Sequence, residues 1–211
     1  MGRAWSDGEL ERVAALAEQH DLVVCSDEIH CDLLLEPAAR HRPLASLGPE
    51  IARRTITLMA PSKTFNVPGL GCAFAVIPDP RLRRDFRTAM HGIVPHVNIL
   101  GLVACEAALR EGGAWRRELL AYLRGNAAAV SAWVARQPSL ATTAVEATYL
   151  AWIDARRMAV EQPARHFEAH GVGLSDGADF AAPGYVRLNF GCRRELLDAA
   201  LARMETALLS S

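Results

Sequence analysis

The alternation of apolar and polar residues predicts helices and short strands that follow one another along the first half of the chain. Ser6 and Glu9 have the spacing of a capping box, and apolar residues recur behind them at helical intervals. Short runs that are wholly apolar and rich in β-branched residues are typical of buried strands. The expected elements are helices at residues 7–20, 79–90 and 97–110 and strands at residues 22–25, 55–59 and 72–77.

The second half of the chain has a different pattern, in which a long helix precedes strand-like and helical segments. We expect helices at residues 115–136 and 195–209 and strands at residues 150–153 and 185–190. Helices that alternate with buried strands favour a parallel-type α/β sheet in the first half, whereas the second half has the pattern of a small α+β unit. Gly112 and Gly113 mark the expected boundary, which gives domains at residues 1–113 and 114–211.

Composition indicates a globular protein and excludes several kinds of partner. The 211 residues are 51% apolar and 22% charged with a formal net charge of −1, so neither nucleic acid nor a membrane surface is expected to bind. Five cysteines, an odd number without a CxxC pair, disfavour a disulfide framework or a zinc site and favour a cytoplasmic location. We expect neither a signal peptide nor a membrane helix, because the N-terminal residues are acidic and no uncharged run is long enough.

Lysine is almost absent from the chain. Of the 23 residues that are lysine or arginine, Lys63 is the only lysine and the other 22 are arginines. A guanidinium stays protonated, whereas a desolvated lysine amine can lose its proton and attack a carbonyl group. Lys63 is therefore a candidate for amine chemistry, with an ordinary surface lysine as the alternative.

Two motifs that carry chemistry in other proteins are incomplete here. Gly173 to Gly177 matches the glycine-flanked serine of α/β-hydrolases, but those enzymes place their histidine after the serine, and the last histidine is His170. His166 and His170 share a helix face, as the two histidines of H-E-x-x-H zinc sites do. The glutamate between them, Glu168, is not at the position that this motif requires, and no third ligand is evident. We therefore expect a glycine turn and a solvated helix face at these places, and no metal site.

Two residues with useful chemistry follow predicted strands. Asp27 comes after the strand at residues 22–25, and Lys63 lies in the loop after the strand at residues 55–59. Ligands of open α/β sheets bind outside the carboxyl ends of the strands, so neighbouring strands would bring both side chains into one crevice. A lysine that bonds to an aldehyde and a carboxylate beside a pyridine nitrogen suit pyridoxal 5′-phosphate (PLP). Glu28 competes with Asp27 for the carboxylate role.

Three segments around these residues resemble the class I/II aminotransferase superfamily, and more closely its cystathionine β-lyase-like branch of C–S lyases. They are Ser26-Asp-Glu-Ile-His-Cys-Asp-Leu33, Ala60-Pro-Ser-Lys-Thr-Phe-Asn-Val-Pro-Gly-Leu70 and Val186-Arg-Leu-Asn-Phe-Gly-Cys192. The resemblance implies the α/β fold of type I PLP-dependent transferases. Residues 1–113 would be the C-terminal part of the large PLP-binding domain, a truncated parallel-type sheet with helices, and residues 114–211 the small α+β domain.

The same resemblance implies a role for each matching residue. Lys63 would form the Schiff base with PLP and remove the substrate α-proton, and Asp27 would pair with the pyridine nitrogen. His30 stands where many relatives have a tyrosine beside the cofactor's 3′-oxygen, and Ser62 would contact the phosphate. Arg187 would bind the substrate α-carboxylate, since strand alternation puts it opposite the apolar side chains and its two-pronged guanidinium suits a carboxylate.

The activity implied is that of a PLP-dependent C–S β-lyase that acts on cysteine-type amino acids and gives pyruvate, ammonia and a thiol. A PLP-dependent aminotransferase is one alternative, because the same residues serve both reactions. Another is an inactive fragment or one half of a split enzyme, because the chain resembles only the C-terminal part of longer proteins. The expected partner is a second copy in the family's homodimer, or a complementary N-terminal half that supplies the missing cofactor-binding elements.

Overall fold

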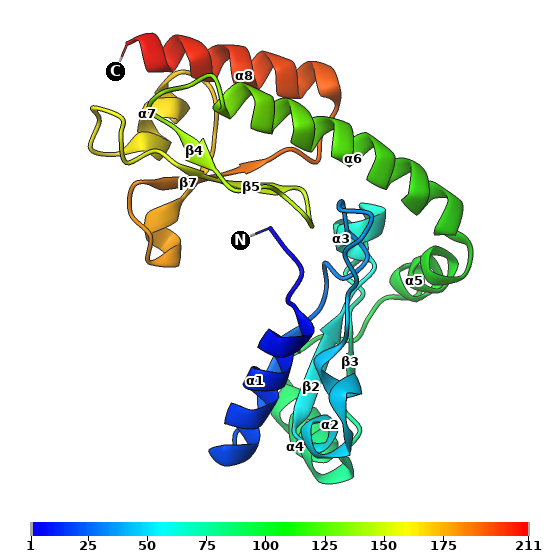
Figure 1. Ribbon diagram of the computed structural model, residues 1–211. Helices are drawn as coiled ribbons and strands as arrows, with labels where there is room; N and C mark the ends of the chain where they lie inside the picture. The colour runs from blue at the N-terminus through cyan, green and yellow to red at the C-terminus, as the bar shows by residue number, and fades with distance from the viewer. Residues whose placement is uncertain (1, 211) are drawn as a thin grey trace. The chain divides into compact units, whose positions relative to one another are not determined.

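The computed structural model of this chain describes residues 2–210, which form two compact units (Figure 1). The N-terminal unit contains Ala4–Leu33 and Arg40–Glu118, and the C-terminal unit contains residues 2–3, 34–39 and 119–210. This division lies within helix α6 (Gly113–Val134), which begins at the second glycine of the pair. The domain boundary expected after Gly113 stays a prediction. No helix among the described residues is long and apolar enough to cross a membrane.

The N-terminal unit has the predicted order of helices and strands. Its elements are α1 (Asp7–Gln19), β1 (Val24–Asp27), η1 (Leu44–Leu47), α2 (Pro49–Arg53), β2 (Thr55–Met59), α3 (Ser62–Phe65), η2 (Pro68–Leu70), β3 (Phe74–Val76), α4 (Pro80–Met90) and α5 (Ile99–Glu111). Side-chain caps explain where the long helices start, because Ser6, Asp79 and Asn98 each accept a hydrogen bond from a backbone N–H of the first turn. The three helices predicted for this part of the chain are confirmed.

A small apolar core holds this unit together. Ala14 and Ala17 of α1 pack with Leu44 and Ile51, and partly buried residues of α1, η1 and β1 surround them. Thr55 of β2 is also fully buried, and its hydroxyl donates a hydrogen bond of 2.7 Å to the carbonyl oxygen of Ile51. The hydroxyl of Thr55, the most deeply buried polar side chain of β2, therefore has a hydrogen-bond partner, as buried polar groups usually do.

The sheet of the N-terminal unit has the strand order β1-β2-β3. β1 and β2 run parallel, whereas β3 pairs antiparallel with β2, so the sheet is mixed and not wholly parallel. A parallel connection needs a crossover of a dozen or more residues, usually with a full helix. Residues 60–73 contain only the short helices α3 and η2, so the chain turns back on itself to form β3.

The two outer strands differ from the sequence prediction in position and in burial. β1 begins at Val24, after Leu22 and Val23, which are 51% and 57% exposed. β3 was expected to be buried, but Phe74 and Val76 are 39% and 50% exposed. An apolar run becomes a buried strand only where another element covers it, and the described residues leave these side chains uncovered.

The C-terminal unit is an α+β layer structure, as predicted. Its elements are most of α6, β4 (Ala141–Thr142), β5 (Leu150–Asp154), α7 (Pro163–Ala169), β6 (Ser175–Asp176), η3 (Gly177–Phe180), β7 (Tyr185–Asn189) and α8 (Arg194–Leu209). The strands form an antiparallel sheet in the order β4-β5-β7-β6, and α6 and α8 lie side by side along one face of it (Figure 1). Ala151, Ile153, Val186 and Leu188 point from the two central strands into the core.

A buried asparagine ties α6 to the end of β7. The Nδ2 atom of Asn126 donates hydrogen bonds of 2.9 Å to the carbonyl oxygens of Phe190 and Cys192. Its Oδ1 atom accepts a bond of 2.9 Å from Nε of Arg194, at the start of α8. Both the amino group and the carbonyl oxygen of the buried Asn126 amide are therefore hydrogen-bonded. These bonds fix the turn between β7 and α8.

Candidate functional site

The parallel pairing of β1 with β2 gives the two strands a common carboxyl edge. Asp27, the last residue of β1, lies opposite Leu58, and the backbone N–H of Glu28 continues the ladder to Leu58 O at 3.0 Å. β2 ends one residue later at Met59, and Lys63 follows in the short helix α3. β1 and β2 are therefore neighbours in the sheet, and Asp27 and Lys63 stand at and just after their carboxyl ends. That the two side chains share one crevice stays a prediction.

Helix α3 holds Lys63 in a defined position. The helix is a single turn that ends at Asn66, whose φ of 55° lies in the left-handed region that asparagine tolerates. Thr64, the next residue after Lys63, is only 2% exposed, so its buried side chain fixes the position of this turn. Lys63 itself is exposed and has no ion-pair partner within residues 2–210, and Ser62 beside it is half-buried. The amine is therefore available to a ligand.

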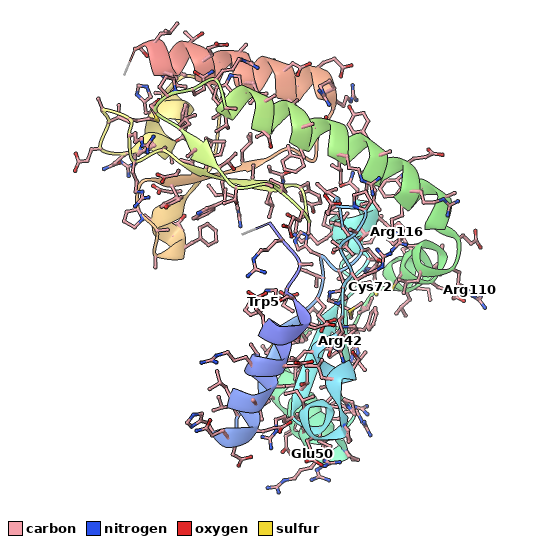
Figure 2. All side chains as sticks on the ribbon, in the orientation of Figure 1. Trp5, Arg42, Glu50, Cys72, Arg110 and Arg116 are labelled. Atoms are coloured by element: carbon pink, nitrogen blue, oxygen red, sulfur yellow. The ribbon has the colours of Figure 1, made fainter. Side chains whose placement is uncertain are left out.

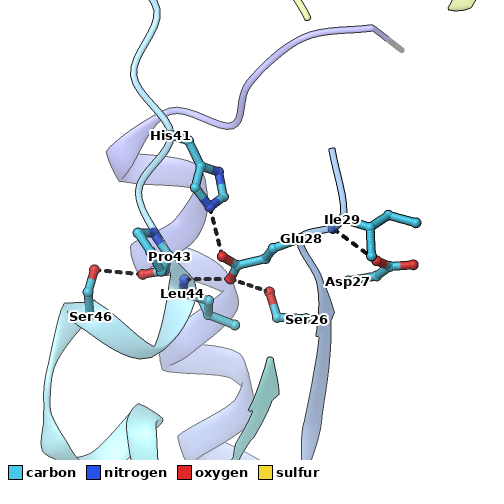
Figure 3. A network of polar contacts seen from close by, with 8 residues as sticks. All are labelled: Ser26, Asp27, Glu28, Ile29, His41, Pro43, Leu44 and Ser46. Atoms are coloured by element: carbon cyan, nitrogen blue, oxygen red, sulfur yellow. Dashed lines mark hydrogen bonds and ion pairs between the residues drawn. The ribbon is translucent and has the colours of Figure 1, made fainter. Parts of the chain in front are cut away.

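The two neighbouring carboxylates at the end of β1 have different environments (Figure 3). Glu28 is 6% exposed, and its carboxylate accepts hydrogen bonds from Ser26 Oγ at 2.9 Å and Leu44 N at 3.2 Å. The His41 Nε2 atom lies 2.7 Å from the other oxygen. Burial alone would raise the pKa of Glu28, but these hydrogen bonds outweigh it and hold the pKa below the ordinary value.

Asp27 points to the other side of the strand and is exposed (Figure 3). Its Oδ1 atom accepts a hydrogen bond of 3.2 Å from the backbone N–H of Ile29, which fixes the side chain over the first residues of the following turn. The Glu28 carboxylate is thus held by hydrogen bonds inside the unit, whereas the Asp27 carboxylate is exposed at the carboxyl end of β1. This difference favours Asp27 over Glu28 as the carboxylate for a ligand.

The turn after β1 carries His30 and Cys31. It is closed by hydrogen bonds of 3.0 Å from Cys31 N to Glu28 O and from Leu33 N to His30 O, and Leu33 is fully buried. Burial, with the nearby charges of Asp32 and Glu28 adding to it, raises the pKa of Cys31 to about 11. Its thiol stays protonated at neutral pH, so Cys31 does not compete with Lys63 as a nucleophile. His30 is half-buried at the same end of β1.

Arg187 belongs to the C-terminal unit, whereas Asp27, His30, Ser62 and Lys63 belong to the N-terminal unit. Its neighbours on β7, Val186 and Leu188, are buried, so the alternation predicted from the sequence is confirmed.

The Arg187 guanidinium is flanked by Ser175 and Phe180, neither of which the sequence predicted as its neighbour. Its Nη2 atom donates to Ser175 Oγ at 3.2 Å, and its Cζ lies 4.6 Å from the centre of the Phe180 ring. Ser175 reaches this position because β6 pairs with β7, a contact between residues distant in sequence that no local motif announces. The hydrogen bond and the aromatic face restrict the orientation of the guanidinium, whose planar shape suits a carboxylate that binds through two parallel hydrogen bonds.

The two histidines of the discarded zinc motif have structural partners. His166 Nε2 lies 2.9 Å from Ala207 O, and His170 lies 2.9 Å from His166 O and 3.1 Å from Ser210 Oγ. The contacts with Ala207 and Ser210 attach α7 to the C-terminal end of α8, so the two histidines are half-buried and the expected solvated helix face is not observed. Among the described residues, no group of three or more histidine, cysteine, aspartate or glutamate side chains is arranged to hold a metal ion.

The comparison with known families identifies the class of protein. Residues 1–204 match the family described as aminotransferase class I and II, so the chain belongs to that family. Cystathionine beta-lyase PatB of Bacillus subtilis (strain 168) is 34% identical over 98% of this chain and 55% of its own length.

Solved structures agree with this assignment. That of OvoB is 50% identical with a TM-score of 0.96 and is matched over 100% of this chain and 55% of its own. Cystalysin from Treponema denticola, whose structure contains a pyridoxal 5′-phosphate cofactor, is 30% identical with a TM-score of 0.92 over 99% of this chain and 55% of its own. The resemblance and the fold class expected from the sequence are confirmed, and the chain spans about half the length of the relatives that it matches.

Proposed function

We propose that this chain carries the lysine-bearing part of a PLP-dependent C–S β-lyase that acts on cysteine-type amino acids. The observation that carries the proposal is the parallel register of β1 with β2, which leaves Asp27 and Lys63 at one edge of the sheet. Membership of the aminotransferase class I and II family supports PLP as the cofactor, and the lyase name of PatB supports the reaction class.

The side chains at this edge have the chemistry that PLP requires. Lys63 offers an exposed primary amine, the group that bonds to the cofactor's aldehyde, and the rest of the chain has no other lysine. Asp27 offers an exposed carboxylate, the group that keeps a pyridine nitrogen protonated. When bound, PLP supplies an electron sink that stabilises negative charge at the substrate Cα.

Each residue then has a task at a stated atom. Lys63 Nζ takes the proton from the substrate Cα, and Asp27 holds the proton on the pyridine nitrogen. Arg187 binds the α-carboxylate through its two-pronged guanidinium and so orients the Cα–H bond. His30 contacts the cofactor's 3′-oxygen, and Ser62 contacts its phosphate.

The overall reaction consumes one water and breaks one C–S bond. A cysteine-type amino acid, R–S–CH₂–CH(NH₃⁺)–COO⁻, and water give the thiol R–SH, pyruvate and ammonium. The thiolate leaves from the β-carbon with the bonding electrons, and no external oxidant or reductant is required. The reaction therefore needs a base at Cα, the role proposed for Lys63, the electron sink that PLP would supply, and a proton for the leaving thiolate.

An absorbance titration of the purified chain with PLP tests the proposal. We expect a band above 400 nm that survives desalting in the wild type, is absent in Lys63→Ala and is retained in Arg87→Ala, which removes an exposed cation from the same unit. Protein that retains the band should release pyruvate from cysteine-type substrates and none from alanine.

Two results would contradict the proposal. A band of equal strength in Lys63→Ala would show that the cofactor does not depend on this lysine. Transfer of the amino group to a keto acid, without release of a thiol from a cysteine-type substrate, would replace the lyase by an aminotransferase.

A further inference from the structure

Helix α3, the single turn that carries Lys63, is also held through the ring of Phe65. Residues two positions apart on a helix lie on opposite sides of it. Accordingly, Lys63 is exposed, whereas Phe65 is half-buried against the junction of α5 and α6. The backbone N–H of Phe65 donates to Pro61 O at 2.8 Å and so closes the turn. Contacts that fix the Phe65 ring therefore also fix the backbone beside Lys63.

Gly112, between α5 and α6, leaves room for the Phe65 ring. A Cβ at this position would lie 2.2 Å from Cε1 of Phe65 and 2.4 Å from the carbonyl oxygen of Ala108. The backbone of Gly112, with φ of −71°, is outside the left-handed region, so close contacts and not backbone conformation require a glycine here. The neighbouring Gly113 differs, because a Cβ there would make only an ordinary contact of 3.8 Å with Arg117 Nη1.

Trp115 contacts the Phe65 ring from the first turn of α6. The two ring centres are 5.8 Å apart and the ring planes are tilted by 33°, within the range in which aromatic rings attract each other. The next residue, Arg116, forms an ion pair with Asp32 in the turn after β1, which holds this part of α6 in place (Figure 2). Trp115 is 44% exposed, so a smaller side chain there opens no buried cavity. The contact with Phe65 can therefore be removed without emptying the core.

The other end of the loop that carries Lys63 is attached to α5 as well. Asn98 Nδ2 donates to Leu70 O at 3.1 Å, while Asn98 Oδ1 accepts from Gly101 N at 2.8 Å and caps the helix. A Cβ on Gly101 would lie 2.4 Å from the same Leu70 oxygen, so helix and loop are in close contact. The loop is thus held near both of its ends, and only the α3 end lies next to Lys63.

We propose that Gly112 and Trp115 are positioning residues for Lys63. They fix the Phe65 ring and, through it, the α3 turn, so that the Lys63 amine has one preferred orientation. The inference rests on the proposed function, in which this amine bonds to the aldehyde of PLP. An amine that is already oriented loses less conformational freedom on bonding than a mobile one, so a larger share of the bound cofactor is bonded to it.

Trapping of the bond to Lys63 tests this role. Equilibrium dialysis measures the total PLP bound, and borohydride reduction followed by mass spectrometry measures how much of it is bonded to Lys63. We expect the bonded share to fall at least about threefold in Trp115→Ala and to be restored in Trp115→Phe, which keeps an aromatic ring against Phe65. Trp5→Ala removes another exposed tryptophan of the same unit and should leave the share unchanged.

A second measurement needs no cofactor. Hydrogen exchange of the Phe65 amide, which is bonded to Pro61 O, reports directly on the α3 turn. We expect this exchange to be at least about threefold faster in Trp115→Ala and in Gly112→Ala than in the wild type, and unchanged in Gly113→Ala. Circular dichroism establishes that the variants remain folded.

Two results would overturn the inference. One is a bonded share that is the same in Trp115→Ala and Trp5→Ala, and the other is Phe65 amide exchange as slow in Trp115→Ala as in the wild type. Failure of the proposed function has a different signature. If wild-type protein bonds no PLP at Lys63, the proposed lyase is wrong, and faster exchange in Trp115→Ala still supports the positioning of the α3 turn.

Discussion

At the scale of single residues, substitution of two adjacent carboxylates at the end of β1 is expected to change the free energy of unfolding by very different amounts. Glu28→Gln keeps the shape of the buried side chain but removes the negative charge of the carboxylate that makes three hydrogen bonds. We expect the free energy of unfolding to fall by about 1–3 kcal/mol, the usual cost of weakening bonds to a buried charged group. Chemical denaturation of the two proteins at neutral pH measures the difference.

The pH dependence of that difference follows from the lowered pKa of Glu28. The pKa of Glu28 is lower in the folded protein than its ordinary value of 4.5. Its ionised carboxylate therefore stabilises the folded protein at pH values above 4.5. The stabilisation is lost as the pH falls through the folded-state pKa, so the gap between wild type and Glu28→Gln should close in acid. A gap that stayed constant down to that range would contradict the assignment.

Asp27→Asn is the matched control. Its side chain is exposed and makes one hydrogen bond to the following turn, so the free energy of unfolding should change by less than about 0.5 kcal/mol. If Asp27 pairs with the pyridine nitrogen of PLP, Asp27→Asn should weaken PLP retention in a protein of unchanged stability. Glu28→Gln should weaken PLP retention only as far as it destabilises the fold.

The sequence locates residues with distinctive chemistry better than it locates their neighbours. Lys63 and Asp27 could be found because one is the only lysine and both follow apolar runs. The residues alone left Glu28 as a competitor of Asp27, and only the family resemblance favoured Asp27. The partners of Glu28 include His41 and Leu44, which folding brings from another part of the chain. Ser175 was set aside because no histidine follows its glycine-flanked motif, and its contact with Arg187 arises only from the pairing of β6 with β7.

At the scale of secondary-structure elements, Asn126 is expected to be a strong contributor to the stability of the C-terminal unit. Asn126→Ala leaves the buried Phe190 carbonyl oxygen and the partly buried Cys192 carbonyl oxygen without their donor, and Arg194 Nε without its acceptor. We expect a loss of about 2–4 kcal/mol in the free energy of unfolding, measured by urea denaturation.

Tyr122→Phe provides the control for this substitution. Tyr122 lies one turn earlier on α6, and its hydroxyl accepts from Arg194 N at 2.6 Å at an exposed position. Water replaces that bond when the hydroxyl is removed, so the loss should stay below about 1 kcal/mol. Equal losses for the two variants would mean that burial of Asn126 adds nothing.

Helices could be predicted closely from the sequence, and strands less so. Ser6, Asp79 and Asn98 cap helices through atoms that lie within three residues, so the signal is local. The direction of β3 depends on how its chain returns to β2, and its exposure depends on what else covers the sheet. β4 and β6 are two residues long and exist only because other strands pair with them.

At the scale of the whole molecule, the two units differ in how much apolar surface they bury. The core of the N-terminal unit centres on two alanines, a leucine and an isoleucine, and large apolar side chains remain exposed around it. The C-terminal unit buries Leu123, Val130, Trp133, Ile153, Phe167, Val186, Phe190, Leu197 and Met204. Since burial of apolar surface is the main stabilising contribution, the C-terminal unit should be the more stable of the two.

We therefore expect urea to unfold the chain in two steps, the N-terminal unit first. The four tryptophans report on the units separately, because Trp5 and Trp115 belong to the N-terminal unit and Trp133 and Trp152 to the C-terminal unit. Variants that keep the tryptophans of one unit, with phenylalanine in the other, should show a lower fluorescence midpoint for the first pair. Coincident transitions for both pairs would instead mean that the two units unfold as one cooperative structure.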